Sequence, residues 1–281
     1  MRCAEMTEIA EQYEYEPQQP QKRRRRFHPG RVMLVIMTLT LMFFALFFLV
    51  YKFIDRGAPG EMSPQRRRAD TRELLRASDT PAALMALLES NPETYDFVNN
   101  YDANRKPISE IDISGDITDG EIPLFLQWDE RWGYDTYGRE MIAITGCGPT
   151  CLSMVAVSLL GDLSLNPRAV ADFADTNGYY AEGVGTEWTL MTDGAAQLGL
   201  SSRVLPLHGP TILSELRAGN PIICSVGSGD FTKNGHYIVL TGVNRDGTVS
   251  VNDPNSVVRS DKTWELDVIM TQVKNLWALS A

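Results

Sequence analysis

Residues 146–161 read GCGPTCLSMVAVSLLG and predict the helix around which the C-terminal half of the chain folds. Pro149 suits the first turn of a helix, where a missing N–H is no loss, and Gly161 suits the position just past a helix end. The apolar residues between them cover nearly the whole circumference, and a helix that is apolar on all sides is buried. We therefore predict a central, buried helix over residues 149–160.

Strands and further helices are predicted on the C-terminal side of this helix. The strands cover residues 200–207, 220–226, 236–243, 248–253 and 276–279, and the helices cover 166–178, 186–199, 211–217 and 265–273. Asn244-Arg245-Asp246-Gly247 has the composition of a hairpin turn and should join two of these strands. The pattern after Ile122 therefore predicts one compact α+β domain.

Cys147 lies just before the predicted central helix, where a thiolate is favoured. A helix N-terminus carries about half a positive charge and unpaired N–H groups. Thiols in such settings ionise more readily than free cysteine does. Gly146 and Gly148 allow other groups to approach the sulfur closely. Cys147 is the candidate nucleophile, although the same pattern also fits a small buried residue.

The other cysteines do not predict a metal or redox site. Cys151 falls one turn along the same helix and reads as a core residue, and Cys224 lies within an apolar strand. A metal site would need more ligands nearby, and His208 and His236 are the other candidates outside the N-terminal region. The sequence also contains no GxxxxGK[ST] or GxGxxG motif and no HExxH helix. We therefore predict neither a metal nor another cofactor.

His236 and Asp253 are the candidate partners of Cys147. His236 begins an apolar strand, and Asp253 ends the next one. If Val243 pairs with Thr248 across a four-residue turn, Ile238 faces Asp253, and Asp253 lies on the same face as His236, about 7–8 Å away. Asn252 then pairs with Val239 and points to the opposite face. A thiolate, an imidazole and a carboxylate in this layout are typical of nucleophilic catalysis.

Four segments together resemble the C39-like cysteine peptidases, relatives of the leader-processing peptidase domain of bacteriocin exporters. They are IPLFLQWDERWG at 122–133, GCGPT at 146–150, Gly235-His236-Tyr237 and Asn252-Asp253-Pro254. They occur in the family's order and span residues 122–281. The resemblance implies a papain-like fold, in which an antiparallel sheet packs on a central helix.

The same resemblance implies roles for individual residues. Cys147 would be the nucleophile, His236 the base, Asp253 the residue that orients His236, and Gln127 the side chain that stabilises the oxyanion. The bacteriocin exporters also contain several membrane spans and a nucleotide-binding domain. The present sequence has no phosphate-binding loop, so the double-glycine leader specificity of those exporters is not implied.

An uncharged apolar run of twenty residues begins at Val32 and ends at Tyr51. A helix of that length crosses the roughly 30 Å hydrocarbon core of a bilayer. A cleaved signal peptide fits less well, because its apolar region is shorter and ends at a small-residue site. The basic cluster Lys22-Arg23-Arg24-Arg25-Arg26 precedes the run and should remain in the cytoplasm. We expect a single-pass anchor with the catalytic domain outside the cell membrane.

The predicted organisation has five parts: a cytoplasmic tail at 1–30, the anchor at 31–53, a stalk at 54–79, a helical extension and connector at 80–121, and the peptidase domain at 122–281. The whole chain has a formal net charge of −10, which argues against nucleic-acid binding, and residues 57–281 have a net charge of −13. We therefore expect a surface-displayed cysteine hydrolase that acts on peptide or isopeptide amide bonds. The alternatives are a catalytically silent module that binds peptides or cell surfaces, and an acyl transferase that uses the same residues.

Overall fold

The computed structural model describes residues 29–56, residue 73 and residues 80–281, and the chain divides into two units, 1–66 and 67–281. In the first unit, helix α1 covers Pro29–Arg56. Most of the predicted tail at 1–30 and most of the predicted stalk at 54–79 lie outside the described residues. Among the described residues, no helix meets the combined length and hydropathy needed to cross a membrane.

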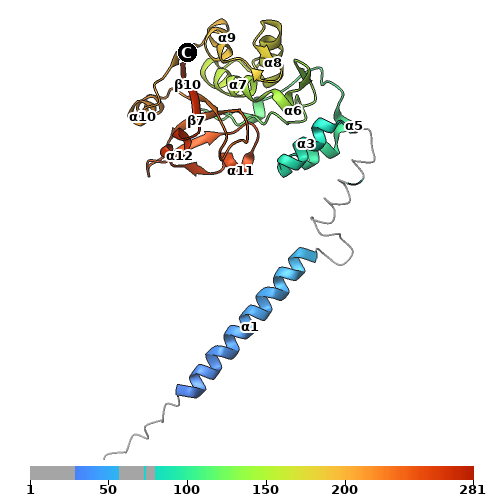
Figure 1. Ribbon diagram of the computed structural model, residues 1–281, viewed down its shortest axis with the longest axis vertical. Helices are drawn as coiled ribbons and strands as arrows, with labels where there is room; N and C mark the ends of the chain where they lie inside the picture. The colour runs from blue at the N-terminus through green and yellow to red at the C-terminus, as the bar shows by residue number, and fades with distance from the viewer. Residues whose placement is uncertain (1–28, 57–72, 74–79) are drawn as a thin grey trace, which may run out of the picture. The chain divides into compact units, whose positions relative to one another are not determined.

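The second unit mixes helices and strands (Figure 1). Its α-helices are α3 (Ala82–Ser90), α4 (Tyr95–Asn99), α5 (Tyr101–Asn104), α6 (Ile142–Thr145), α7 (Cys147–Leu160), α8 (Pro167–Thr176), α9 (Asp193–Gln197), α10 (Gly209–Arg217), α11 (Val257–Ser260) and α12 (Leu266–Met270). The 3-10 helices are η1 (Pro92–Thr94), η2 (Ser114–Asp116) and η3 (Trp188–Met191). The strands are β1 (Thr136–Tyr137), β2 (Glu140–Met141), β3 (Tyr180–Ala181), β4 (Gly185–Thr186), β5 (Ser201–Val204), β6 (Ile222–Val226), β7 (His236–Val243), β8 (Val249–Asn252), β9 (Thr263–Trp264) and β10 (Val273–Ser280).

A six-stranded sheet forms the centre of this unit. Its strand order is β5-β10-β6-β7-β8-β9, and every neighbouring pair is antiparallel. Strand β6 is buried along its whole length, because both faces of the sheet are covered. The α+β class predicted from the sequence is therefore confirmed.

Successive side chains of a strand point to opposite faces, and this alternation builds two separate cores. On one face, Ile223 and Val239 pack with the buried residues of α7 and α8. On the other face, Cys224 and Ile238 pack with Ile212 of α10 and the buried residues of α12. The sheet therefore packs α7 against β7, the strand that begins with His236.

Three predicted helices differ from the structure, and one of them, predicted at 265–273, ends at Met270 before β10 begins at Val273. Helix α7 begins at Cys147, two residues before Pro149, because Gly146 N donates to Ile142 O and the short helix α6 leads directly into α7. The predicted helix at 186–199 is divided into η3 and α9. Thr186 cannot start a helix there, because it pairs with Tyr180 in the β3–β4 ribbon.

The helical extension forms a third core with the region that follows residue 121. Leu84, Leu88 and Phe97 of the extension are buried with Tyr134 and Ala143. The rings of Phe97 and Tyr134 stack at 4.2 Å between centroids, and the Tyr134 hydroxyl donates to Phe97 O at 2.7 Å. The extension is therefore packed onto the domain through buried side chains.

Candidate active site

Cys147 is the first residue of α7 and is partly exposed. The sequence on either side brings the chain close to the sulfur. A Cβ on Gly146 would lie 2.6 Å from both Ile142 Cγ2 and Ile142 O, so only glycine fits the turn between α6 and α7. A Cβ on Gly148 would lie 2.6 Å from Thr186 Oγ1, so glycine also lets β4 pack against the start of α7.

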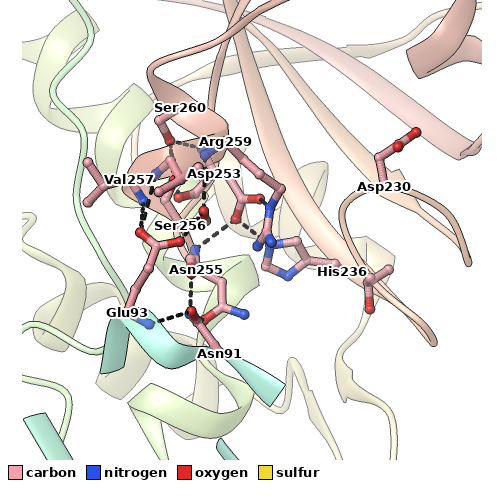
Figure 2. Close-up of polar contacts among 12 residues, drawn as sticks. Asn91, Glu93, Asp230, His236, Asp253, Asn255, Ser256, Val257, Arg259 and Ser260 are labelled. Carbon is pink, nitrogen blue, oxygen red and sulfur yellow. Dashed lines mark hydrogen bonds and ion pairs between the residues drawn. The ribbon is translucent and has the colours of Figure 1, made fainter. Parts of the chain in front are cut away.

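His236 is buried at the start of β7, where it pairs with Val226 of β6. Its Nε2 atom lies 2.8 Å from Asp253 Oδ1 (Figure 2). Since Nε2 is engaged by Asp253, Nδ1 is the ring nitrogen left for another partner.

Asp253 directly follows β8 and is fully buried. The Asn255 backbone N–H donates to its Oδ1 atom at 2.8 Å, and Arg259 Nε donates to its Oδ2 atom at 2.5 Å (Figure 2). Burial alone would raise the pKa of Asp253, but the charges of His236 and Arg259 and the hydrogen bonds from them lower it below its usual range. The carboxyl group is therefore an anion that binds two cationic side chains.

The imidazole of His236 has a raised pKa. Burial by itself lowers the pKa, but the charge of Asp253 and its hydrogen bond act in the opposite direction. Cys147 also raises the pKa through a hydrogen bond and its charge, and the net result is a pKa of about 10. The raised pKa favours the charged form of His236, and the Cys147 side chain is among the groups that raise it.

The hairpin that aligns His236 with Asp253 differs from the predicted one. The turn is one residue longer than expected, because Val243 pairs with Val249 and not with Thr248. Thr248 belongs to the turn, where its N–H and hydroxyl both donate to Asp246 Oδ1. This register alone would place Asp253 opposite Val239, on the face away from His236.

A β-bulge compensates for the longer turn and restores the predicted pairing near His236. The register shifts between Leu240 and Gly242, so that Val239 pairs with Asn252 as predicted. Asp253 therefore lies on the His236 side, whereas Asn252 Nδ2 donates to Ile122 O at 2.9 Å and Pro123 O at 3.0 Å. The carboxylate of Asp253, and not the amide of Asn252, contacts the imidazole.

Gln127 contacts both the segment that follows Asp253 and the segment that precedes Cys147. Its backbone N–H donates to Pro254 O at 2.7 Å, and its side-chain Nε2 donates to Ala143 O, also at 2.7 Å. Ala143 belongs to α6, the turn that leads into Cys147. The Gln127 Oε1 atom is buried without a hydrogen-bond partner. One of the two hydrogens on Gln127 Nε2 binds Ala143 O, so the other hydrogen is available to a second acceptor.

The remaining described cysteines lie in the core. Cys151 and Cys224 are both fully buried, and burial raises the pKa of each thiol well above its usual value. Within the described part of the chain, no three His, Cys, Asp or Glu side chains gather in a way that could hold a metal ion.

Three residues that contribute to the site were not predicted from the sequence. Arg259 binds Asp253, and Asn91 and Glu93 bind the segment that follows Asp253 (Figure 2). Ser256 carries a local signal, since a serine three residues before Arg259 suits a helix N-cap. No local pattern could have connected this segment with residues some 164 positions earlier.

A comparison with known families covers the same region of the chain. The model of the family described as Peptidase_C39 like matches residues 120–280. The chain belongs to this family. A search of curated proteins found no match.

Membership of the Peptidase_C39-like family makes the matched region a cysteine-peptidase-like domain. The match includes Gln127, Cys147, His236 and Asp253, and also Arg259. It begins after the helical extension, so Asn91 and Glu93 lie outside the matched region.

Proposed function

We propose that this protein is a cysteine hydrolase that cleaves peptide or isopeptide amide bonds. Cys147 is the nucleophile, His236 the general acid and base, and Asp253 the group that orients His236. The observation that carries the proposal is the 2.8 Å contact between His236 Nε2 and Asp253 Oδ1, together with the effect of Cys147 on the same imidazole. An oriented imidazole beside a thiol at a helix N-terminus is the arrangement that thiol-dependent acyl transfer requires.

The first step forms a bond between Cys147 Sγ and the carbonyl carbon of the substrate. The imidazolium of His236 then gives its Nδ1 proton to the departing amine as the C–N bond breaks, which leaves a thioester. His236 next takes a proton from water, the hydroxide attacks the thioester, and Cys147 leaves as the thiolate. Asp253 remains ionised throughout and keeps the ring orientation fixed.

Gln127 stabilises the negative charge on the substrate oxygen in this proposal. Its Nε2 atom is already held by Ala143 O, next to the segment that carries Cys147. A donor that is fixed before the reaction needs no reorganisation when the charge develops, which makes its hydrogen bond effective. The backbone N–H of Cys147 is the second donor.

We also propose that the hydrolase domain is displayed outside the cell membrane on an N-terminal anchor. Support comes from the uncharged run of residues 32–51 and from the basic cluster that precedes it. Along α1, large apolar side chains such as Met33, Phe43 and Phe47 are exposed. Exposed apolar surface of this kind marks an interaction site. The natural substrates of a hydrolase displayed in this way would be secreted peptides, surface proteins or cell-wall cross-bridges.

The proposal is tested with full-length protein in mild detergent. Unstructured protein substrate and cross-bridge peptides are incubated with the wild type and with Cys147→Ala, and the products are identified by mass spectrometry. New termini or released cross-bridges with the wild type alone support hydrolysis. Binding of peptide without cleavage by either protein would instead establish the silent binding module. Products in which an added amine replaces water would establish acyl transfer.

A further inference from the structure

The helical extension contacts the segment that carries Asp253, although it precedes the family match. Glu93 Oε1 accepts from Ser256 Oγ at 2.5 Å (Figure 2). Glu93 Oε2 accepts from the backbone N–H groups of Val257 at 2.8 Å and Val258 at 3.2 Å. One carboxylate thus satisfies three donors at the start of α11.

Asn91 adds a second contact two residues away. Its Nδ2 atom donates to Asn255 O at 2.6 Å and lies 3.1 Å from Asn255 Oδ1. Its Oδ1 atom accepts from Glu93 N at 3.0 Å, which fixes the two side chains relative to each other. Asn91 is buried and Asn255 is partly buried, so water competes little for this contact.

The bound segment carries both Asp253 and its cationic partner Arg259. Internal contacts connect the two ends: Asp253 N donates to Ser260 Oγ at 2.9 Å, and Arg259 N donates to Ser256 Oγ at 3.0 Å. Helix α11 has only four residues, and so short a helix is not stable by itself. Its position, and with it the position of Arg259, therefore depends on contacts from elsewhere in the fold.

The same extension also packs against the segment that leads to Cys147. Buried side chains of α3 and α4 contact Ala143, and Met141 and Ile144 pack against the same cluster. Trp128, which also contacts this cluster, donates from Nε1 to Asn255 O at 3.3 Å. The extension therefore touches both sides of the site, the Cys147 side through apolar packing and the Asp253 side through hydrogen bonds.

We propose that Asn91 and Glu93 are positioning residues, and that the extension at residues 80–104 is a clamp that holds Asp253 against His236. The catalytic consequence rests on the proposed function, but the effect on the His236–Asp253 pair does not. Without the Glu93 carboxylate, three donors lose their acceptor and the segment loosens. Asp253 then lies farther from the imidazole on average, and its attraction to the imidazolium falls with distance.

The pKa of His236 is the quantity to measure, because it requires no substrate. Full-length protein labelled with ¹⁵N-histidine contains three histidines, so its imidazole signals can be assigned by mutation and titrated by NMR. In Glu93→Gln the amide presents a donor where an acceptor is needed. We expect the pKa of His236 to fall by at least about one unit relative to the wild type. Glu110→Gln is the matched control, since Glu110 is exposed in the connector, and it should leave the pKa unchanged.

A second variant covers the case in which Glu93→Gln does not fold. Asn91→Asp keeps the acceptor for Glu93 N and removes the donor to Asn255, and it should lower the pKa of His236 in the same direction. The rate at which Cys147 is carboxymethylated should fall about 10- to 100-fold in either variant, since a displacement of about 1 Å at a catalytic site costs reactivity on this scale.

An unchanged pKa of His236 in a folded Asn91→Asp or Glu93→Gln protein overturns the clamp. A lowered pKa in a protein that cleaves no substrate supports the clamp and removes the proposed hydrolase function, so the two can be told apart.

Discussion

Arg259 binds Asp253 on the carboxylate oxygen that His236 leaves free. Its Nε atom donates to Asp253 Oδ2 at 2.5 Å, whereas His236 Nε2 lies 2.8 Å from Oδ1. The Asp253 side chain is fully buried, and that of Arg259 is 23% exposed. A buried carboxylate would otherwise gain a proton, so Arg259 helps to keep Asp253 ionised and fixed in orientation.

Loss of this guanidinium should destabilise the domain. Arg259→Met leaves Asp253 Oδ2 buried without its cation, and we expect the free energy of unfolding to fall by about 2 kcal/mol. This loss is smaller than the usual cost of breaking a fully buried ion pair, because Arg259 is partly exposed. Urea unfolding measures the change. The matched control is Arg139→Met, because the Arg139–Glu182 ion pair is exposed and should contribute less than about 1 kcal/mol. Equal losses in the two variants would contradict this role of Arg259.

Cys147 should react with thiol-directed electrophiles much faster than Cys151 or Cys224. Cys147 is partly exposed at the start of α7 beside His236, whereas burial keeps the other two thiols protonated and out of reach. Brief exposure of the folded protein to iodoacetamide at neutral pH, followed by peptide mapping, gives the order of labelling. Earlier labelling at Cys151 or Cys224 would refute the prediction.

Asp253 and Asn252 should differ sharply in their effect on turnover. Asp253→Ala removes the group that orients His236, and we expect a loss of about 10²- to 10⁴-fold in kcat/KM. Asn252→Ala should change kcat/KM only slightly, since Asn252 binds Ile122 O and Pro123 O on the opposite face. Circular dichroism verifies that both variants fold. Comparable losses of activity would mean that the hairpin register does not determine the catalytic pair.

His236 should make the stability of the domain depend on alkaline pH. Its pKa is raised in the folded state to about 10 from an ordinary value of 6.5. A group whose pKa is raised on folding stabilises the fold fully at pH values below its unfolded-state pKa. This stabilisation is lost as the pH rises through the folded-state pKa. The stability advantage of the wild type over His236→Gln should therefore shrink between about pH 6 and about pH 10. Thermal unfolding of both proteins across this range provides the test, and an advantage that grew with pH would reverse the assignment.

The proposed topology predicts an uncleaved chain with its C-terminus outside. The basic residues Lys22 to Arg26 should hold the N-terminus in the cytoplasm. Protease added to intact cells should remove the hydrolase domain and leave an N-terminal tag protected. A mature chain that begins after residue 51, or a C-terminal domain that resists protease, would show that the anchor or its orientation is wrong.

Elements whose signals are local could be predicted from the residues alone. Gly161 ends α7, Asn166 caps α8 through Ala169 N, and the apolar run that follows His236 forms β7 as predicted. Gly146, Gly148 and Pro149 mark the start of the buried helix in the sequence, and Cys147 lies among them. Such patterns depend on neighbours a few residues away, so they can be recognised without knowledge of the fold.

The way in which Asp253 reaches His236 could not be predicted from local patterns. The predicted pairing of Val239 with Asn252 is present, but it arises from a longer turn and a compensating bulge at Thr241, neither of which the local sequence indicates. The contacts of Asn91 and Glu93 with the segment at 255–258 connect residues about 164 positions apart. Those contacts exist because buried packing of the extension onto Tyr134 and Ala143 brings the two segments together, and long-range packing of this kind leaves no periodic trace in the sequence.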